Sequence, residues 1–250
     1  MLQSNLYINK VSIAKEIPHG NYLKDLPVVK NLKKMGGIRL NKNVTFLVGE
    51  NGVGKSTLIE GIAVAMGFNP EGGTVNFNFA TNESHSDLHQ YLTVSRGYKP
   101  RKDGFFLRAE SFYNVASQIE ELDEEPDSRA RLIDSYGGVS LHKQSHGESF
   151  MALVENRFGG NGLYILDEPE AALSPMRLMR LMCYMQDLVQ KDSQFIISTH
   201  SPILMTFLGA EVLEITEERI QTVDYRDTEH FLITKRFMDV PEKMVGELLG

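Results

Sequence analysis

The sequence predicts an α/β domain whose mostly parallel sheet is flanked by helices. Apolar, strand-like runs alternate with segments of helical periodicity at 44–66 and again at 163–198, which is typical of β–α–β units. The chain has 250 residues, a length that favours one such domain with a smaller subdomain over two full domains. Ligands of these sheets bind at the carboxyl ends of the strands, so we expect the functional residues there.

Each expected element rests on its own local pattern. The β-branched, apolar run at 44–48 is typical of a buried parallel strand, and apolar residues at helical spacing over 55–66 predict the helix that follows. Further strands are expected at 104–108, 163–166 and 195–198, and further helices at 112–122, 149–158 and 176–191. Short strands and loops are expected over the rest of 1–48 and over 68–104, while 211–250 carries no motif.

Composition and charge exclude several classes of protein. Apolar residues make up 42% and charged residues 24%, which excludes disordered and fibrous chains. The net charge is −7, whereas proteins that bind nucleic acid mainly through phosphates are more often basic. The single cysteine, Cys183, excludes an internal disulfide and a Cys-based zinc cluster. Because no signal pattern and no membrane-spanning apolar run occurs, we expect a cytoplasmic protein that contacts a membrane only through a partner.

Residues 49–56 match the P-loop pattern G-x-x-x-x-G-K-[ST] and lie between an expected strand and an expected helix. The loop N–H groups and the helix N-terminus present partial positive charge to a phosphate chain. Lys55 is expected to reach the β- and γ-phosphates, and the Ser56 hydroxyl to bind Mg²⁺. A chance glycine-rich turn is the alternative, which the flanking strand and helix disfavour. The predicted nucleotide-binding residues are Gly49, Glu50, Asn51, Gly52, Val53, Gly54, Lys55, Ser56 and Thr57.

Two carboxylates end the strand expected at 163–166. Asp167 is placed to hold Mg²⁺ opposite the P-loop serine, and Glu168 can polarise a water that attacks the γ-phosphate. Acidic residues often close strands, but together with a P-loop they predict a phosphoryl-transfer site. His200 follows the next strand. Alone it would be a structural hydrogen-bonding residue, but beside these motifs we expect it near the γ-phosphate.

A further loop completes a set of motifs that resembles the ATP-binding cassette class of P-loop ATPases. The family's signature loop usually reads Leu-Ser-Gly-Gly-Gln. In the segment Gln144–Glu148, Ser145 and Gly147 keep its serine and second glycine, and Glu148 replaces its glutamine. His200 matches the family's switch histidine. More narrowly, the chain is similar to stand-alone bacterial ATPases of this class, whose core is shared with DNA-repair ATPases of the structural-maintenance-of-chromosomes type.

The resemblance implies a P-loop NTPase fold of the ATP-binding cassette type, with an antiparallel β part and a small helical subdomain. It implies one cassette domain over 1–250, in which 1–111 and 160–250 form the core and 112–159 the helical, signature-bearing part. Two family elements lack a clear match. Arg108 or Glu110 could substitute for the Q-loop glutamine, and Tyr7 or Tyr22 could stack on adenine.

In this class the signature loop completes the ATP site of a second subunit. The resemblance therefore implies a head-to-tail homodimer that closes on two ATP molecules and opens after hydrolysis. It implies that Glu168 orients the attacking water, while Lys55, Mg²⁺ and His200 stabilise the transferring phosphoryl group. Ser145, Gly147 and Glu148 would then contact the nucleotide of the partner copy.

The function predicted is that of a soluble, Mg²⁺-dependent ATPase whose dimer cycle acts on nucleic acid or a protein partner. One alternative is the nucleotide-binding subunit of a membrane transporter, which the altered signature and the repair-type core disfavour. Another is a nucleotide-sensing regulator of a toxin or nuclease, and the intact Asp167–Glu168 pair argues against a loss of hydrolysis. Basic clusters at 30–42 and 99–102 hint at DNA, but ordinary surface charge explains each.

Overall fold

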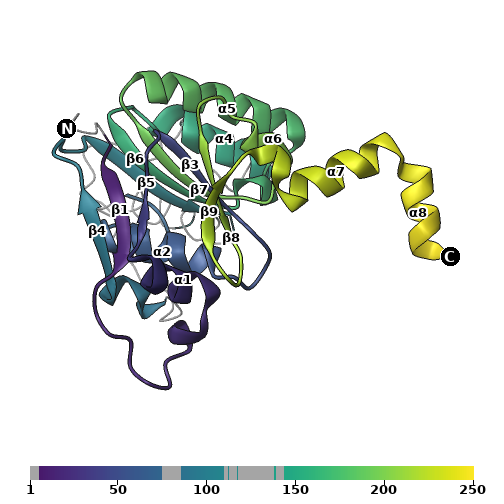
Figure 1. The fold of residues 1–250 in the computed structure, drawn as a ribbon. Coiled ribbons are helices and arrows are strands. Elements are labelled where there is room, and N and C mark those ends of the chain that lie inside the picture. Colours follow the sequence, from purple (N-terminus) through teal and green to yellow (C-terminus); the bar gives the residue numbers. More distant parts are fainter. Residues whose placement is uncertain (1–5, 75–85, 110–111, 113–116, 118–137, 139–143) are drawn as a thin grey trace.

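The computed structural model describes residues 6–74, 86–109, 112, 117, 138 and 144–250. A six-stranded sheet of order β5-β6-β7-β3-β8-β9 forms its centre, and an antiparallel sheet of order β2-β1-β4 lies beside it (Figure 1). The central strands are β3 (Val44–Val48), β5 (Asp103–Arg108), β6 (Gly162–Asp167), β7 (Gln194–Ser198), β8 (Glu211–Ile215) and β9 (Ile220–Val223). The small sheet contains β1 (Ile8–Ile13), β2 (Ile38–Arg39) and β4 (Leu92–Arg96). All neighbours in the central sheet are parallel except β8 and β9, so the predicted fold class is confirmed.

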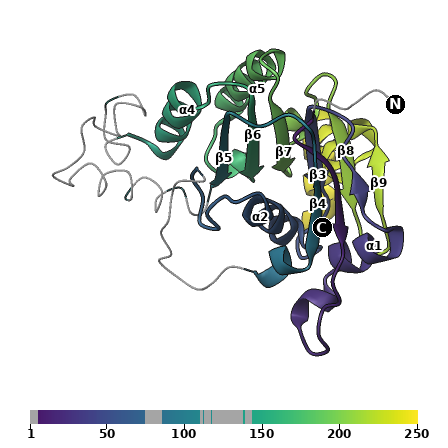
Figure 2. The ribbon, with the colours of Figure 1, turned by 90° about the vertical axis from the view of Figure 1, so that its left-hand side faces the viewer.

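Helices cover both faces of the central sheet. Figure 2 shows α4 and α5 on one face of β5, β6 and β7, and α2 on the other. The helices are α1 (Pro27–Met35), α2 (Lys55–Ala65), α4 (His146–Arg157), α5 (Pro175–Gln190), α6 (Pro202–Met205), α7 (Glu229–Asp239) and α8 (Pro241–Leu249). The alternation of strand side chains produces this arrangement. In β3, Phe46 packs into the core with α4, α5 and α6, while Leu47 packs into the core with α1 and α2.

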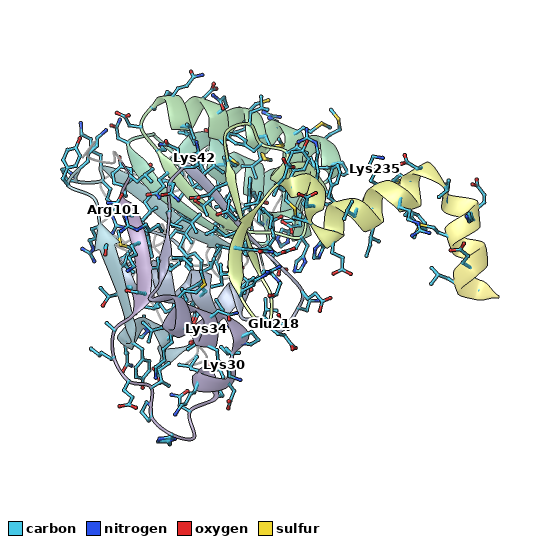
Figure 3. All side chains as sticks on the ribbon, viewed as in Figure 1. Lys30, Lys34, Lys42, Arg101, Glu218 and Lys235 are labelled. Carbon is cyan, nitrogen blue, oxygen red and sulfur yellow. The ribbon has the colours of Figure 1, made fainter. Side chains whose placement is uncertain are left out.

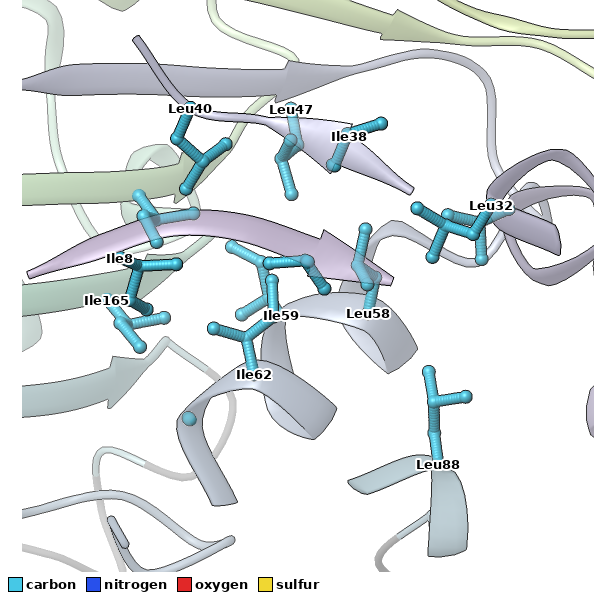
Figure 4. Close-up of a cluster of buried hydrophobic side chains, with 14 of the residues drawn as sticks. Ile8, Leu32, Ile38, Leu40, Leu47, Leu58, Ile59, Ile62, Leu88 and Ile165 are labelled. Atoms are coloured by element: carbon cyan, nitrogen blue, oxygen red, sulfur yellow. The ribbon is translucent and has the colours of Figure 1, made fainter. Parts of the chain in front are cut away.

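The second of these cores joins the two sheets. Its side chains come from β1, α1, β3, α2 and β6, and Figure 4 shows Ile8, Leu47, Ile59 and Ile165 among them. One fully buried polar side chain also bridges the sheets. The Gln194 carbonyl accepts from the backbone N–H groups of Tyr7 and Ile8, both at 2.8 Å, and its amide donates to the Ile8 carbonyl at 2.9 Å. The Gln194 side chain thus satisfies backbone groups at the start of β1 that have to be paired when they are buried.

The predicted strands and the two long helices are confirmed to within one or two residues. The helix expected at 149–158 begins earlier, at His146, because Ser145 caps it. Most of the helix expected at 112–122 lies outside the described residues. α1 falls within the region expected to hold only strands and loops, because Pro27 opens a turn that buries Val28, Val29 and Leu32.

The C-terminal region differs most from the expectation for 211–250. It contains β8 and β9 and then α7 and α8, which extend away from the sheets (Figure 1). Neither α7 nor α8 buries a residue, and neither helix was expected from the sequence. Among the described residues, no helix is both long and apolar enough to cross a bilayer.

Candidate active site

The P-loop is built between β3 and α2, as the motif predicts. Gly49 has φ 142°, and a Cβ there would lie 2.2 Å from the Ile215 carbonyl oxygen, so only glycine lets the loop pass β8. Gly54 has φ 95°, and a Cβ there would lie 2.7 Å from a Val28 methyl group. Val28 N–H also donates to the Val53 carbonyl at 3.0 Å. α1 therefore packs directly on the loop and holds its shape.

Lys55 is buried at the centre of this loop. Its Nζ donates to the carbonyl oxygens of Gly49 and Glu50, both at 2.8 Å, and its exposed fraction is 5%. Because an ammonium has three N–H donors, these bonds leave one for a phosphate oxygen. Burial lowers the pKa of Lys55, and the charges of Glu168, Asp167 and Glu170 act in the opposite direction. The two carboxylates predicted for the site are thus close enough to Lys55 to affect its charge.

Three polar residues lie in register at the carboxyl ends of neighbouring strands. Arg108 of β5 pairs with Asp167 of β6, which pairs with Ser198 of β7. Arg108 Nε donates to Asp167 Oδ2 at 3.1 Å, and the Ser198 hydroxyl donates to Asp167 Oδ1. Arg108 Nη2 also donates to Glu60 of α2 at 2.8 Å. The side chains of Asp167 and Glu60 are 4% and 7% exposed, so the guanidinium joins two buried carboxylates across the sheet edge.

Glu168 adopts a backbone conformation that non-glycine residues rarely take, with φ 48° and ψ 55°. Its N–H donates to Ser198, to the carbonyl at 3.1 Å and to the hydroxyl at 3.2 Å. Strain of this kind is retained where the surrounding structure enforces it, which is often at functional sites. The turn directs the Glu168 side chain to His200, with Oε1 and Nε2 3.6 Å apart.

His200 is fixed on two sides. Its backbone N–H donates to Glu170 Oε1 at 2.5 Å, and its Nδ1 lies 2.6 Å from Nε2 of His230, on α7. Its Nε2 is buried and has no hydrogen-bond partner among the described residues. Burial, then the charges of Lys55 and His230, lower the pKa of His200 to about 4. The imidazole is therefore neutral at pH 7, with one unpartnered ring nitrogen directed toward Glu168.

The signature loop forms the N-terminus of α4. Both N–H and hydroxyl of Ser145 donate to Glu148 Oε2, at 3.0 and 2.6 Å, and these bonds lower the pKa of the exposed Glu148 carboxyl. Arg177 of α5 holds the other oxygen of Glu148 at 3.2 Å. Gly147 is buried, and a Cβ at this position would lie only 2.8 Å from the Ala172 carbonyl oxygen. The loop therefore has a packing function as well as any contact with a partner.

Two side chains at this edge of the sheet carry oxygens of the kind that Mg²⁺ prefers. Ser56 lies in the first turn of α2, directly after the loop, and Asp167 is a buried carboxylate at the carboxyl end of β6. Hydroxyl and carboxylate oxygens are the donors that Mg²⁺ prefers, together with water and phosphate oxygens. Among the described residues, no three His, Cys, Asp or Glu side chains are grouped so that they could hold a metal ion by themselves.

The candidates for adenine stacking and for the Q-loop position lie in different parts of the structure. Tyr7 is 3% exposed and bonds to Asp192 at the amino end of β7, so it lies at the wrong sheet edge for adenine. Tyr22 is 60% exposed, before α1, and stays a candidate. Arg108 takes the position expected of a Q-loop stand-in, while Glu110 lies outside the described residues.

Four site residues were not predicted: Glu60, Glu170, Ser198 and His230. Ser198 could have been found by aligning the ends of the strands predicted at 163–166 and 195–198. The contacts of the other three join distant segments and have no local signal. A cavity of about 410 Å³ beside the P-loop is lined by this loop, by the β8–β9 turn and by the start of α7, including Thr228, Glu229 and His230.

Comparisons with known proteins agree with this geometry. Residues 29–145 match a family model described as an AAA domain, and residues 150–206 match one described as an AAA domain of a candidate AbiEii toxin, type IV TA system. A chain from an ABC transporter structure in an inward-facing conformation superposes with a TM-score of 0.50 at 13% identity, covering 91% of this chain and 88% of that one. The fold is therefore the ATP-binding cassette fold.

Curated relatives point the same way. The arabinose import ATP-binding protein AraG of Pseudomonas savastanoi is 28% identical, covering 70% of this chain and 36% of that protein. The guanosine import ATP-binding protein NupO of Bacillus subtilis is 27% identical, with 78% and 42% covered. The Retron Vc95 probable ATPase of Vibrio cholerae is 27% identical, with 56% and 30% covered. The chain thus spans less than half of each relative. Fold, motifs and relatives together support a P-loop ATPase of the ATP-binding cassette class.

Proposed function

We propose that this chain binds Mg-ATP at the carboxyl edge of its sheet and hydrolyses it. The observation that carries the proposal is the meeting of Lys55, Asp167, Glu168 and His200 at one edge. The Asp167 and Glu168 carboxylates lie close enough to alter the Lys55 pKa, and Glu168 faces His200 at 3.6 Å. These are the charges that a transferring phosphoryl group requires: a cation for the phosphates, a carboxylate for the water and a donor at the γ-phosphate.

Each residue then has a definite task. The P-loop N–H groups and Lys55 bind and orient the phosphates, Ser56 and Asp167 hold Mg²⁺, and Glu168 accepts a hydrogen bond from the attacking water. Magnesium, when bound, neutralises charge on the phosphate oxygens. The strained turn at Glu168 aims its carboxylate away from the Asp167 network, so the two neighbouring carboxylates serve different partners.

We further propose that two copies share each ATP in a head-to-tail dimer. α4 and α2 lie on opposite faces of the central sheet (Figure 2), which supports a contact between Ser145 and the nucleotide of another copy rather than its own. Phosphate oxygens there would replace Glu148 at the Ser145 hydroxyl. ATP would then favour the closed dimer because only that state provides these contacts.

Turnover tests the proposal directly. Glu168→Gln keeps the shape of the side chain but removes the charge that orients water, so we expect phosphate release to fall at least about 100-fold while ATP binding stays within about threefold. Glu218→Gln is the matched control, because Glu218 is exposed on the β8–β9 turn (Figure 3). Equal turnover in wild type and Glu168→Gln would remove Glu168 from this task.

The action of the cycle has two candidates. One is a switch acting on nucleic acid or a protein partner, and the relatives include the Retron Vc95 probable ATPase, whose name is not that of an importer. The nucleotide-binding subunit of an importer is favoured by the names of AraG and NupO. The basic residues give DNA little direct support. Lys42 lies far from Lys30 and Lys34 (Figure 3), while Lys99 pairs with Asp192 and Arg101 stacks on Phe68.

Phosphate release with and without double-stranded DNA separates these two. Stimulation by DNA would support the switch. A rate of phosphate release that is unchanged by DNA but raised by a multi-span membrane partner would support the importer.

A further inference from the structure

The switch histidine is held by a second histidine from a distant helix. His230 lies in the first turn of α7, and its Nε2 is 2.6 Å from Nδ1 of His200, with the ring centroids 4.6 Å apart. α7 is anchored just before this point. Thr228 is 1% exposed, and its hydroxyl donates to the Tyr225 carbonyl at 2.7 Å and contacts the sulfur of Met205, on α6.

The hydrogen bond between the two rings has one donor and one acceptor. If His200 donated from Nδ1, its Nε2 would carry a lone pair, which would face the Glu168 carboxylate across 3.6 Å. That arrangement sets a lone pair against a negative charge. If His230 donates instead, His200 carries its proton on Nε2, and this N–H points to Glu168. The second arrangement is the favourable one.

At neutral pH His200 is not doubly protonated, so only the two arrangements above need to be compared. Lys55 faces the ring from α2, His230 from α7, and Glu168 and Glu170 from the end of β6 and the turn after it. Burial, and then Lys55 and His230, lower the pKa of His200 to about 4. The ring therefore carries a single proton, and its position decides whether Nε2 donates or accepts.

We propose that His230 is a positioning residue that donates to Nδ1 of His200 and thereby keeps the proton of the switch histidine on Nε2, ready to donate to the γ-phosphate. The buried, unpartnered Nε2 is the atom that such a ligand would satisfy. The inference rests on the proposed function, because it assumes that the γ-phosphate lies beside Glu168.

The same contact makes α7 part of the ATP site. α7 buries none of its residues, so its N-terminal anchor and the histidine pair hold it on the body of the protein. Any displacement of α7 that separates the two rings would remove the His230 donor from Nδ1 of His200. α7 thereby connects the surface of the protein to the γ-phosphate.

Substitutions at His230 test the proposal. His230→Leu removes the donor, and we expect kcat to fall about tenfold, the worth of one hydrogen bond to the reacting site, with KM changed less than about twofold. His230→Gln keeps an N–H donor at the same reach, and we expect it to restore kcat to within about threefold. Lys235→Ala is the control on the same helix, because Lys235 is exposed and pairs with the equally exposed Asp239 (Figure 3).

A spectroscopic readout separates positioning from mere folding. In protein with ¹⁵N-labelled histidine and without nucleotide, the two ring nitrogens of His200, assigned by their loss in His200→Ala, should show the proton on Nε2. In His230→Leu the shifts should move toward a mixture of the two forms. Wild-type kcat and unchanged shifts in His230→Leu would overturn the proposal. Absence of turnover in wild type would instead overturn the proposed function, while the shifts would still decide the role of His230.

Discussion

Arg108 joins two buried carboxylates, and its removal should cost more stability than any exposed ion pair in the described part of the chain. Its guanidinium donates to Asp167 at 3.1 Å and to Glu60 at 2.8 Å. Burial disfavours the Arg108 charge, but Asp167 and Glu60 outweigh it, so the pKa of the guanidinium is raised. Arg108→Ala leaves both carboxylates without their cation.

The magnitude follows from their burial. Because the Asp167 and Glu60 side chains are 4% and 7% exposed, water does not replace the lost contacts. Removing one partner of a buried ion pair costs about 3–5 kcal/mol. For a chain of this size that loss lowers Tm by roughly 6–20 °C. Arg108→Lys keeps the charge but has no planar fork to reach both carboxylates, so an intermediate Tm is expected.

Thermal unfolding followed by circular dichroism at pH 7.5 measures the effect. Arg226→Ala is the control, since Arg226 and Asp224 form an exposed pair at 3.4 Å with side chains 64% and 51% exposed. We expect that change to shift Tm by less than roughly 4 °C. If Arg108→Ala melted within a degree of Arg226→Ala, the two carboxylates would not depend on Arg108 and the reasoning would fail.

Three further predictions concern the surroundings of the site. Gly49→Ala places a Cβ 2.2 Å from the Ile215 carbonyl oxygen, so both Tm and ATP affinity should fall well below those of Gly20→Ala. Gly20 also has a positive φ, of 86°, but open space around it. Equal losses in the two variants would contradict the clash. Gln194→Leu removes the side-chain partner of three backbone groups of Tyr7 and Ile8, so the free energy of unfolding should fall by about 3 kcal/mol or more. Urea unfolding measures this loss, with Gln186→Leu as the control because Gln186 is exposed. A difference below about 1 kcal/mol between the two variants would count against the role of Gln194 in joining the sheets. Because the pKa of His200 is lowered to about 4 in the folded protein, the unfolded chain binds a proton first as the pH falls. The free energy of unfolding should therefore decrease as the pH falls from roughly 6.5 toward 4. His200→Gln should reduce this dependence on pH, and an unchanged dependence would refute the assignment.

Much of this site could be predicted from local sequence because its chemistry sits at strand ends. The β-branched run before Gly49 and the apolar run before Asp167 each fix a buried strand, and parallel pairing then brings their carboxyl ends to one edge. The structure places Lys55, Asp167 and His200 there as expected.

The contacts that tune these groups could not be predicted. Glu60 lies on the helix after the P-loop, and its partner Arg108 lies across the sheet, so neither has a nearby pattern. His230 belongs to a helix with no buried residue, and no motif in its local sequence marks it as a site residue. Its pairing with His200 depends on how β8 and β9 place the C-terminal segment. Register across three strands and the packing of a distant helix are tertiary properties, and a single sequence does not state them.

Native mass spectrometry of Glu168→Gln with Mg-ATP tests the central claim most directly. The account predicts a species of two chains, each of 28.2 kDa, that carries two intact ATP molecules and is absent without nucleotide. Bound ADP would show that hydrolysis does not need Glu168. A single chain that holds one ATP at saturation would show that the site is complete within one copy, and the shared, head-to-tail arrangement would be wrong.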